Sequence, residues 1–160
     1  MTEHRVKIAE WVVAGAPATI VTIGLGSCVA IVLHDATARV GGLAHVLLPS
    51  PARAADSERP GKCPSSAVPR LLEEMRALGA RGAITARLVG GASLFGPLLA
   101  GTGLGSMGER NVAASREALA LARVRVVGEL VGGDVGRSVY FDVASGRVQV
   151  RSVRDGDRVL

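Results

Sequence analysis

Residues 21–49 read VTIGLGSCVAIVLHDATARVGGLAHVLLP, and this stretch decides the fold. It contains apolar runs rich in β-branched residues, separated by short turns of glycine or polar residues, which is the pattern of successive β-strands. The pattern predicts three strands, at residues 19–23, 28–34 and 40–47, with turns at residues 24–27 and 35–39.

Two reactive side chains lie on neighbouring predicted strands of this stretch, the thiol of Cys28 and the imidazole of His45. Neighbouring strands in a sheet are about 4.8 Å apart, so the two groups could meet across the ladder. Such a pair suits a cysteine nucleophile with a histidine as its base. Each residue also has a simpler explanation, because Cys28 could be a small buried hydrophobe and His45 a core histidine with only structural hydrogen bonds.

The rest of the chain adds strands and two helices. The sequence predicts strands at residues 6–14, 83–89, 124–130, 138–143 and 147–153, helices that begin near Ser65 or Ser66 and at residue 112, and a long polar loop at 50–64. The first helix has an apolar stripe and ends at Gly79, and Asn111 is a good N-cap for the second, which spans 112–122. The stripe consists of Val68, Leu71, Leu72, Met75 and Leu78.

The order of these elements predicts the fold class. Strands outnumber helices, and the two alternate only in the middle of the chain, so the class is α+β. The expected architecture is a mixed β-sheet sandwich with two main helices packed on one face. At 160 residues, with 48% apolar side chains, we expect a single domain over residues 1–160.

Charge and hydropathy argue against nucleic-acid binding and against membrane insertion. The formal net charge is +5, but the arginines are scattered and the chain has only one Trp, one Tyr and two Phe, so no stacking platform for nucleic acid is expected. A basic surface favours an acidic protein partner. Residues 11–34 and 88–108 carry no charge, but proline and glycine interrupt both, which indicates strands and turns rather than membrane insertion.

The two cysteines, Cys28 and Cys63, are too few for a disulfide framework, and no secretory leader precedes them. The expected compartment is therefore the cytoplasm, where thiols stay reduced. A metal site built from Cys28, Cys63, His34 and His45 is a further idea, but no metal-ligand spacing supports it. We expect neither a metal nor a cofactor.

Five motifs in a fixed order resemble one known family. They are Thr22-x-Gly24-Leu25-Gly26-Ser27-Cys28-Val29, Gly42-Leu43-Ala44-His45-Val46-Leu47-Leu48-Pro49, Gly90-Gly91-Ala92-x-x-Phe95, Gly108-x-Arg110-Asn111 and Gly132-Gly133-x-x-Gly136-Arg137. Together they are similar to the motifs of the chemoreceptor glutamine deamidases, the CheD family. Three positions depart from the family's usual pattern, Cys63, Arg87 and Leu130, and none of them belongs to the expected catalytic residues.

The resemblance implies a cysteine hydrolase that converts selected glutamine side chains of methyl-accepting chemotaxis receptors into glutamates. It also implies binding to a CheC-type phosphatase. In this family the nucleophile matches Cys28, the base matches His45, and the residue that matches Thr22 completes a triad. The alternative is a non-catalytic adaptor that docks on the phosphatase and modulates it.

The chemistry can also be reasoned from the residues. A free thiol has a pKa of about 8.5, so it needs a base near neutral pH, and the imidazole of His45 can take its proton and pass it to departing ammonia. Thr22 can accept a hydrogen bond from the other ring nitrogen and so fix the tautomer. The backbone N–H groups of Gly26, Ser27 and Cys28 could stabilise the tetrahedral oxyanion. Water would then hydrolyse the thioester.

Overall fold

The computed structural model describes residues 1–93 and 105–160, and it places ten strands of this described part in two five-stranded sheets. The first sheet has the order β1 (Thr2–Arg5), β3 (Ala18–Leu25), β8 (Arg137–Asp142), β9 (Val148–Ser152) and β10 (Gly156–Val159). The second has the order β2 (Trp11–Gly15), β5 (Val40–Val46), β4 (Val29–Asp35), β6 (Ile84–Gly90) and β7 (Arg125–Val131).

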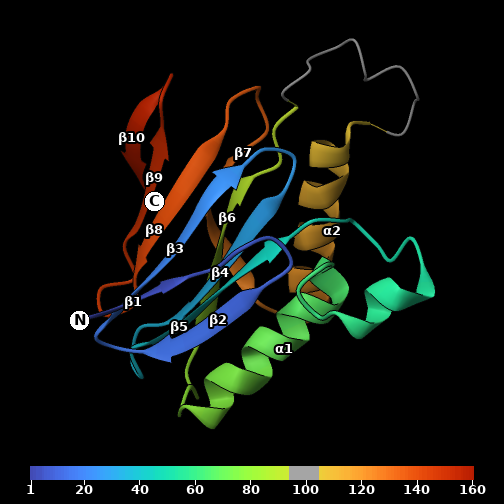
Figure 1. Cartoon of the computed structure of the whole chain (residues 1–160). Helices are drawn as coiled ribbons and strands as arrows, with labels where there is room; N and C mark the ends of the chain where they lie inside the picture. The colour runs from blue at the N-terminus through green and yellow to red at the C-terminus, as the bar shows by residue number, and fades with distance from the viewer. Residues whose placement is uncertain (94–104) are drawn as a thin grey trace.

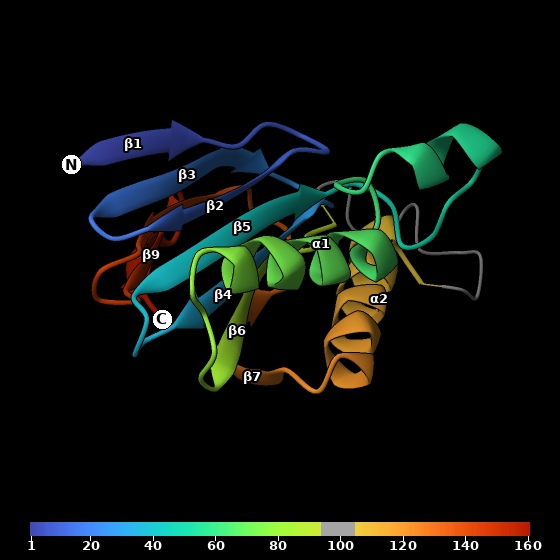
Figure 2. The same ribbon diagram turned by 90° about the horizontal axis from the view of Figure 1, so that it is seen from below.

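The two sheets and the two helices form three layers (Figure 1). Helix α1 (Pro64–Ala77) packs against β5 and β2, and helix α2 (Met107–Leu121) packs against β4, β6 and β7, so both cover the same sheet. Figure 2 shows the helices on the face of this sheet that points away from the first sheet. One apolar cluster fills the space between the sheets and another lies between the second sheet and the helices. The predicted α+β sandwich with two helices on one face is confirmed.

The three strands predicted at 19–47 are present as β3, β4 and β5, but they do not belong to one sheet. Strands β4 and β5 pair antiparallel, with Ala30 opposite His45. Strand β3 lies in the opposite sheet, between β1 and β8. The glycine-rich turn after Leu25 therefore carries the chain from one layer of the sandwich to the other, directly before Cys28.

The single opening strand predicted at 6–14 is wrong. Residues 2–5 form β1, parallel to β3, and residues 11–15 form β2, antiparallel to β5 in the other sheet. The segment between them crosses from sheet to sheet, and Ala9 there has a left-handed backbone with φ 64°. The apolar and polar alternation at 6–9 reflects this crossing, in which Val6 and Ala9 are buried.

Helix α1 confirms most of the predicted pattern. It begins at Pro64 after Cys63 as N-cap, and Gly79 has φ 101° beyond its end, as expected for a C-terminal cap. Four residues of the predicted stripe are buried: Val68, Leu71, Leu72 and Met75. Leu78 is the exception at 52% exposure, because the helix ends at Ala77 and Leu78 is its C-cap.

Helix α2 begins five positions before the predicted residue 112, at Met107. Its N-cap is Ser106, whose Oγ accepts a hydrogen bond from the Glu109 N–H at 3.1 Å. The prediction that Asn111 caps this helix is therefore wrong, since Asn111 lies inside it. Phe95, the last residue of the motif that begins at Gly90, lies outside the described residues.

The predicted loop at 50–64 contains a short 3-10 helix, η1 (Ala54–Glu58). Strand β10 has no counterpart among the predicted elements, because its four residues are all exposed and carry no apolar alternation. Of the helices in the described ranges, none is both long enough and apolar enough to cross a bilayer.

Candidate active site

His45 and Thr22 are joined across the sandwich, from β5 in one sheet and β3 in the other. The Thr22 Oγ1 donates to the Val6 carbonyl at 2.7 Å and lies 2.7 Å from His45 Nδ1. Since the single hydroxyl proton is directed at Val6, Oγ1 must accept from the imidazole, so neutral His45 carries its proton on Nδ1. Both side chains are 1% exposed. The bond leaves Nε2 as the unprotonated nitrogen, and this atom is buried with no hydrogen-bond partner among the described residues.

Cys28 lies at the turn between β3 and β4, on the same face of the second sheet as His45. Cys28, Ala30 and Leu43 belong to the cluster between the two sheets. Side chains alternate along a strand, so His45, two positions after Leu43, faces the same interior. Ala30 pairs with His45, and Cys28 lies two positions before Ala30, one residue beyond the end of the β4–β5 ladder. Cys28 and His45 therefore lie near the same end of this face.

The thiol and the imidazole do not form a hydrogen bond in this structure, since Nε2 has no partner. Burial raises the pKa of the Cys28 thiol, and the hydrogen bond from its own backbone N–H lowers it only in part. Burial also lowers the pKa of His45 from 6.5 to about 4. Both effects favour the uncharged forms. The resting pair is therefore a neutral thiol beside a neutral imidazole rather than a thiolate and an imidazolium.

The backbone around Cys28 is held by its carbonyl groups. The Ala92 N–H donates to the Gly26 carbonyl at 2.8 Å, and the Gly91 N–H donates to the Cys28 carbonyl at 2.8 Å. The Ser27 carbonyl accepts from the Asn111 side chain at 2.9 Å. Gly26 and Ser27 are half-buried. Three successive carbonyls thus point into the protein.

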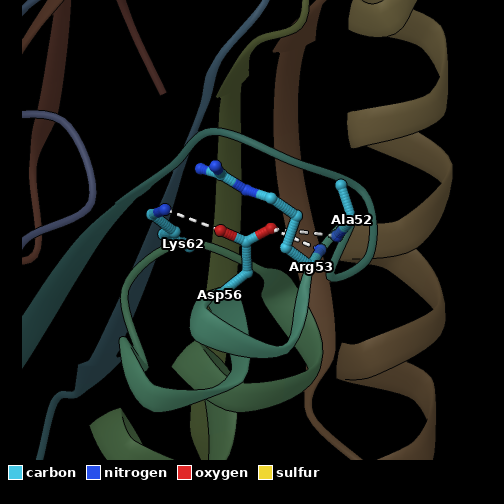
Figure 3. A network of polar contacts seen from close by, with 4 residues as sticks. All are labelled: Ala52, Arg53, Asp56 and Lys62. Carbon is cyan, nitrogen blue, oxygen red and sulfur yellow. Dashed lines mark hydrogen bonds and ion pairs between the residues drawn. The ribbon is translucent and has the colours of Figure 1, made fainter.

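A long loop leaves the histidine strand and returns beside it. The Leu47 and Leu48 N–H groups donate to the Lys62 carbonyl at 2.9 and 3.0 Å. Figure 3 shows how Asp56 organises this loop, because its carboxylate accepts from Lys62 Nζ at 2.7 Å and from the Ala52 and Arg53 N–H groups at 3.0 Å each. The hydrogen bond from Lys62, followed by that from Arg53, lowers the pKa of Asp56 to about 2.

The crossing segment at 6–10 closes the other side of His45. The Ala9 N–H donates to the His45 carbonyl at 2.9 Å, and the His45 N–H donates to the Glu10 carbonyl at 3.1 Å. Gly61 of the long loop packs against this segment, and a Cβ at Gly61 would lie 2.2 Å from the Ala9 carbonyl oxygen. The histidine is therefore enclosed by two segments that are distant in sequence.

The structure brings Thr22, His45 and Cys28 into the interior between the two sheets, Thr22 from one sheet and His45 from the other, with Gly26 and Ser27 in the turn before Cys28. The metal idea finds no support in the described ranges, where no three His, Cys, Asp or Glu side chains gather. Two contributors were not foreseen, the Val6 carbonyl and the Asn111 side chain. Asn111 does lie within the Gly108-x-Arg110-Asn111 motif, which was the signal available in the sequence.

Comparisons with known proteins agree in one family. The family model described as "CheD chemotactic sensory transduction" matches residues 47–152. A relative from Geobacter metallireducens, named "Probable chemoreceptor glutamine deamidase CheD 2", is 46% identical over 151 residues, 93% of each chain. "Probable chemoreceptor glutamine deamidase CheD" of Desulforamulus reducens is 38% identical over 99% of this chain and 95% of its own. A protein of the same name from Methanococcus maripaludis is 41% identical over 92% of this chain and 93% of its own.

Proposed function

We propose that this chain, which belongs to the CheD family, is a protein-glutamine deamidase that hydrolyses glutamine side chains of chemoreceptors to glutamate. The relatives' names support the substrate class, and the family match with full-length relatives supports the assignment of residues 1–160 to one deamidase domain. We place the enzyme in the cytoplasm, where a thiol nucleophile stays reduced.

The first half of the reaction forms a thioester. The Cys28 Sγ attacks the carboxamide carbon as its proton moves to His45 Nε2, which gives a tetrahedral oxyanion. The same Nε2–H then protonates the departing nitrogen. The C–N bond breaks, ammonia leaves, and the acyl group remains on sulfur.

The second half releases the acid. A water molecule gives a proton to Nε2 and attacks the thioester carbon, which forms a second tetrahedral intermediate. The C–S bond then breaks, Cys28 recovers its proton from His45, and the glutamate side chain departs. No external oxidant, reductant or cofactor is needed to balance these steps.

The tautomer of His45 is the observation that carries the catalytic proposal. The bond from Nδ1–H to Thr22 leaves Nε2 free to accept a proton, on the face of the sheet that Cys28 shares. Thr22 is itself fixed by the Val6 carbonyl, so the ring has one preferred orientation. A neutral threonine orients the ring but adds no negative charge, so it stabilises the imidazolium less than an aspartate would.

Backbone N–H groups supply the oxyanion site in this proposal. In a trans peptide the C=O and the following N–H point in opposite directions. Because the Gly26 and Ser27 carbonyls are bound inside the protein, the N–H groups of Ser27 and Cys28 point the other way. In this proposal the Cys28 N–H donates to the oxyanion, which forms on the former amide oxygen of the substrate, next to the new C–S bond.

The experiment is a deamidation assay on a receptor cytoplasmic fragment, with mass detection of the amide-to-acid change and measurement of released ammonia. Cys28→Ala should abolish both signals, and His45→Ala should nearly do so. Cys63→Ala is the matched control, because Cys63 is the other buried cysteine and has no proposed catalytic role. It lies at the N-cap of α1. Deamidation that persists in Cys28→Ala would refute the nucleophile assignment.

A CheC-type phosphatase is the second proposed partner, and the family resemblance supports it. Cys28→Ala separates this role from catalysis, because an adaptor needs its surface and not its thiol. We expect Cys28→Ala to bind the phosphatase as the wild type does while it fails to deamidate. A protein that binds the phosphatase but never releases ammonia, even with the thiol intact, would be the adaptor instead.

A further inference from the structure

Asn111 joins the ends of the two strands that carry the proposed nucleophile and base. It lies in α2, is fully buried, and uses both N–H groups of its side-chain amide. One donates to the Ser27 carbonyl at 2.9 Å and the other to the Leu47 carbonyl at 3.1 Å. These carbonyls belong to the residue before Cys28 and to the second residue after His45.

Helix packing alone does not account for an asparagine at this position. The buried face of α2 also carries Val112 and Leu119, which pack in the apolar cluster below the second sheet. Asparagine is a weaker helix former than leucine, and within residues 1–93 and 105–160 no group bonds to the buried Asn111 Oδ1. A buried unsatisfied acceptor costs stability. The side chain therefore contributes more than burial, and its two donors are the features that leucine would lack.

The first of these bonds orients a peptide plane. The Ser27 carbonyl points at α2, so the Cys28 N–H of the same peptide points away from the helix. The neighbouring carbonyls of Gly26 and Cys28 are held by Ala92 and Gly91. The first turn of α2 packs against the Gly91-Ala92 turn through Gly108, where a Cβ would lie 2.4 Å from the Gly91 oxygen. One helix end thus supports all three bonds.

The second bond fixes the chain that leaves β5. The Leu47 carbonyl is held by Asn111 and the Leu47 N–H by the Lys62 carbonyl, so this residue is bonded on both sides. One side chain therefore ties the residue before Cys28 to the second residue after His45, which limits how far these two segments can move apart. The ladder itself ends at the pair Val29 and Val46, just short of these positions.

We propose that Asn111 is a positioning residue for deamidation, which sets the Cys28 N–H in the oxyanion site and holds the thiol within reach of His45. This inference rests on the proposed function. A shift of about 1 Å in a reacting group can reduce turnover by roughly 100-fold. Removing the two donors should therefore lower kcat by about 10- to 100-fold and leave KM nearly unchanged, since Asn111 is buried and does not reach the protein substrate.

The test uses Asn111→Leu, with Asn111→Asp as a second variant that keeps the size of the side chain but removes its paired donors. Ser115→Ala is the matched control. Ser115 is also fully buried in α2, one turn later, and its Oγ donates only to the Asn111 main-chain carbonyl at 2.7 Å. We expect the loss of kcat in both Asn111 variants and wild-type kcat in the control. An equal loss in Ser115→Ala, or wild-type kcat in a folded Asn111 variant, would overturn the proposal.

A second readout does not depend on turnover. Iodoacetamide labelling of Cys28 should accelerate in Asn111→Leu because the turn is released, while Cys63 at 1% exposure serves as an internal reference for global opening. An increased ratio of Cys28 to Cys63 labelling supports the positioning role. Parallel acceleration of both thiols, or an unchanged ratio, refutes it. If the wild type itself releases no ammonia, the proposed function fails, and the labelling ratio still decides whether Asn111 holds the turn.

Discussion

Burial of neutral His45 should make the protein lose stability as the pH falls from 7 to 5. The pKa of His45 is lowered from 6.5 to about 4 in the folded state. Between these values the unfolded chain binds a proton that the folded chain does not, so stability falls as the pH falls. The penalty begins below pH 6.5 and is complete below pH 4.

The magnitude follows from the two pKa values. Linkage predicts that the free energy of unfolding falls by about 2 kcal/mol between pH 7 and pH 5. The total loss reaches about 3 kcal/mol below pH 4. Carboxylates contribute in a lower window. Asp56, whose pKa is lowered from 3.8 to about 2, loses its stabilising effect only as the pH falls below 3.8 and through 2. The titration of Asp56 therefore lies outside the window from pH 7 to pH 5, and a variant without the His45 imidazole isolates the contribution of that ring.

Urea unfolding at pH 7 and pH 5 measures this effect, with His45→Gln as the reference because glutamine does not titrate. The wild type should lose about 2 kcal/mol more than the variant over this interval. Titration of the His45 ring by NMR should give the lowered pKa directly. An equal loss of unfolding free energy in the wild type and His45→Gln, or a His45 ring that titrates near 6.5, would refute the description of the site as a neutral, desolvated pair.

Three further predictions follow from the same geometry. Activity, as kcat/KM on a receptor fragment, should stay level from pH 7.5 down to pH 5.5, because His45 with its pKa lowered to about 4 is still an unprotonated base there; a fall centred near 6.5 would contradict this. Thr22→Val should lower kcat less than His45→Ala and reduce stability by about 1–3 kcal/mol, since the Val6 carbonyl and the Nδ1–H lose their partner; chemical denaturation and steady-state kinetics measure both. Gly61→Ala should destabilise the fold by about 1–3 kcal/mol, because its Cβ would lie 2.2 Å from the Ala9 oxygen, and a wild-type melting temperature would show that the two segments can separate freely.

Local patterns in the sequence predicted the strands at 19–47, the first helix and the fold class, because each depends on periodicity or on a cap. The apolar stripe of α1 and the left-handed Gly79 are examples. The family resemblance predicted from five motifs is confirmed by the family match and by full-length relatives. These features need no knowledge of which elements become neighbours.

Long-range partnerships were the part that the sequence left open. The contact of Thr22 with His45 was expected from the family resemblance, but a strand pattern does not say to which sheet it belongs, so nothing in residues 18–25 indicated that Thr22 lies in the opposite sheet. The break between β1 and β2 was missed for the same reason, since alternation continues through the crossing segment. Asn111 satisfied the rule for an N-cap, but Ser106 satisfies it too, and only the position of the helix decides between them.

The neutral resting pair changes how thiol reactivity in this protein should be understood. Burial raises the pKa of both Cys28 and Cys63, so neither thiol gains reactivity from being ionised near neutral pH. If Cys28 is labelled faster than Cys63, the cause must be its greater exposure, which is 7% for Cys28 and 1% for Cys63. A neutral, buried thiol reacts slowly with small electrophiles. It becomes a nucleophile when a carboxamide is bound next to it and His45 Nε2 takes its proton as the C–S bond forms. Selectivity for particular receptor glutamines would then arise from docking that brings the amide to a fixed thiol, rather than from a nucleophile that is already ionised.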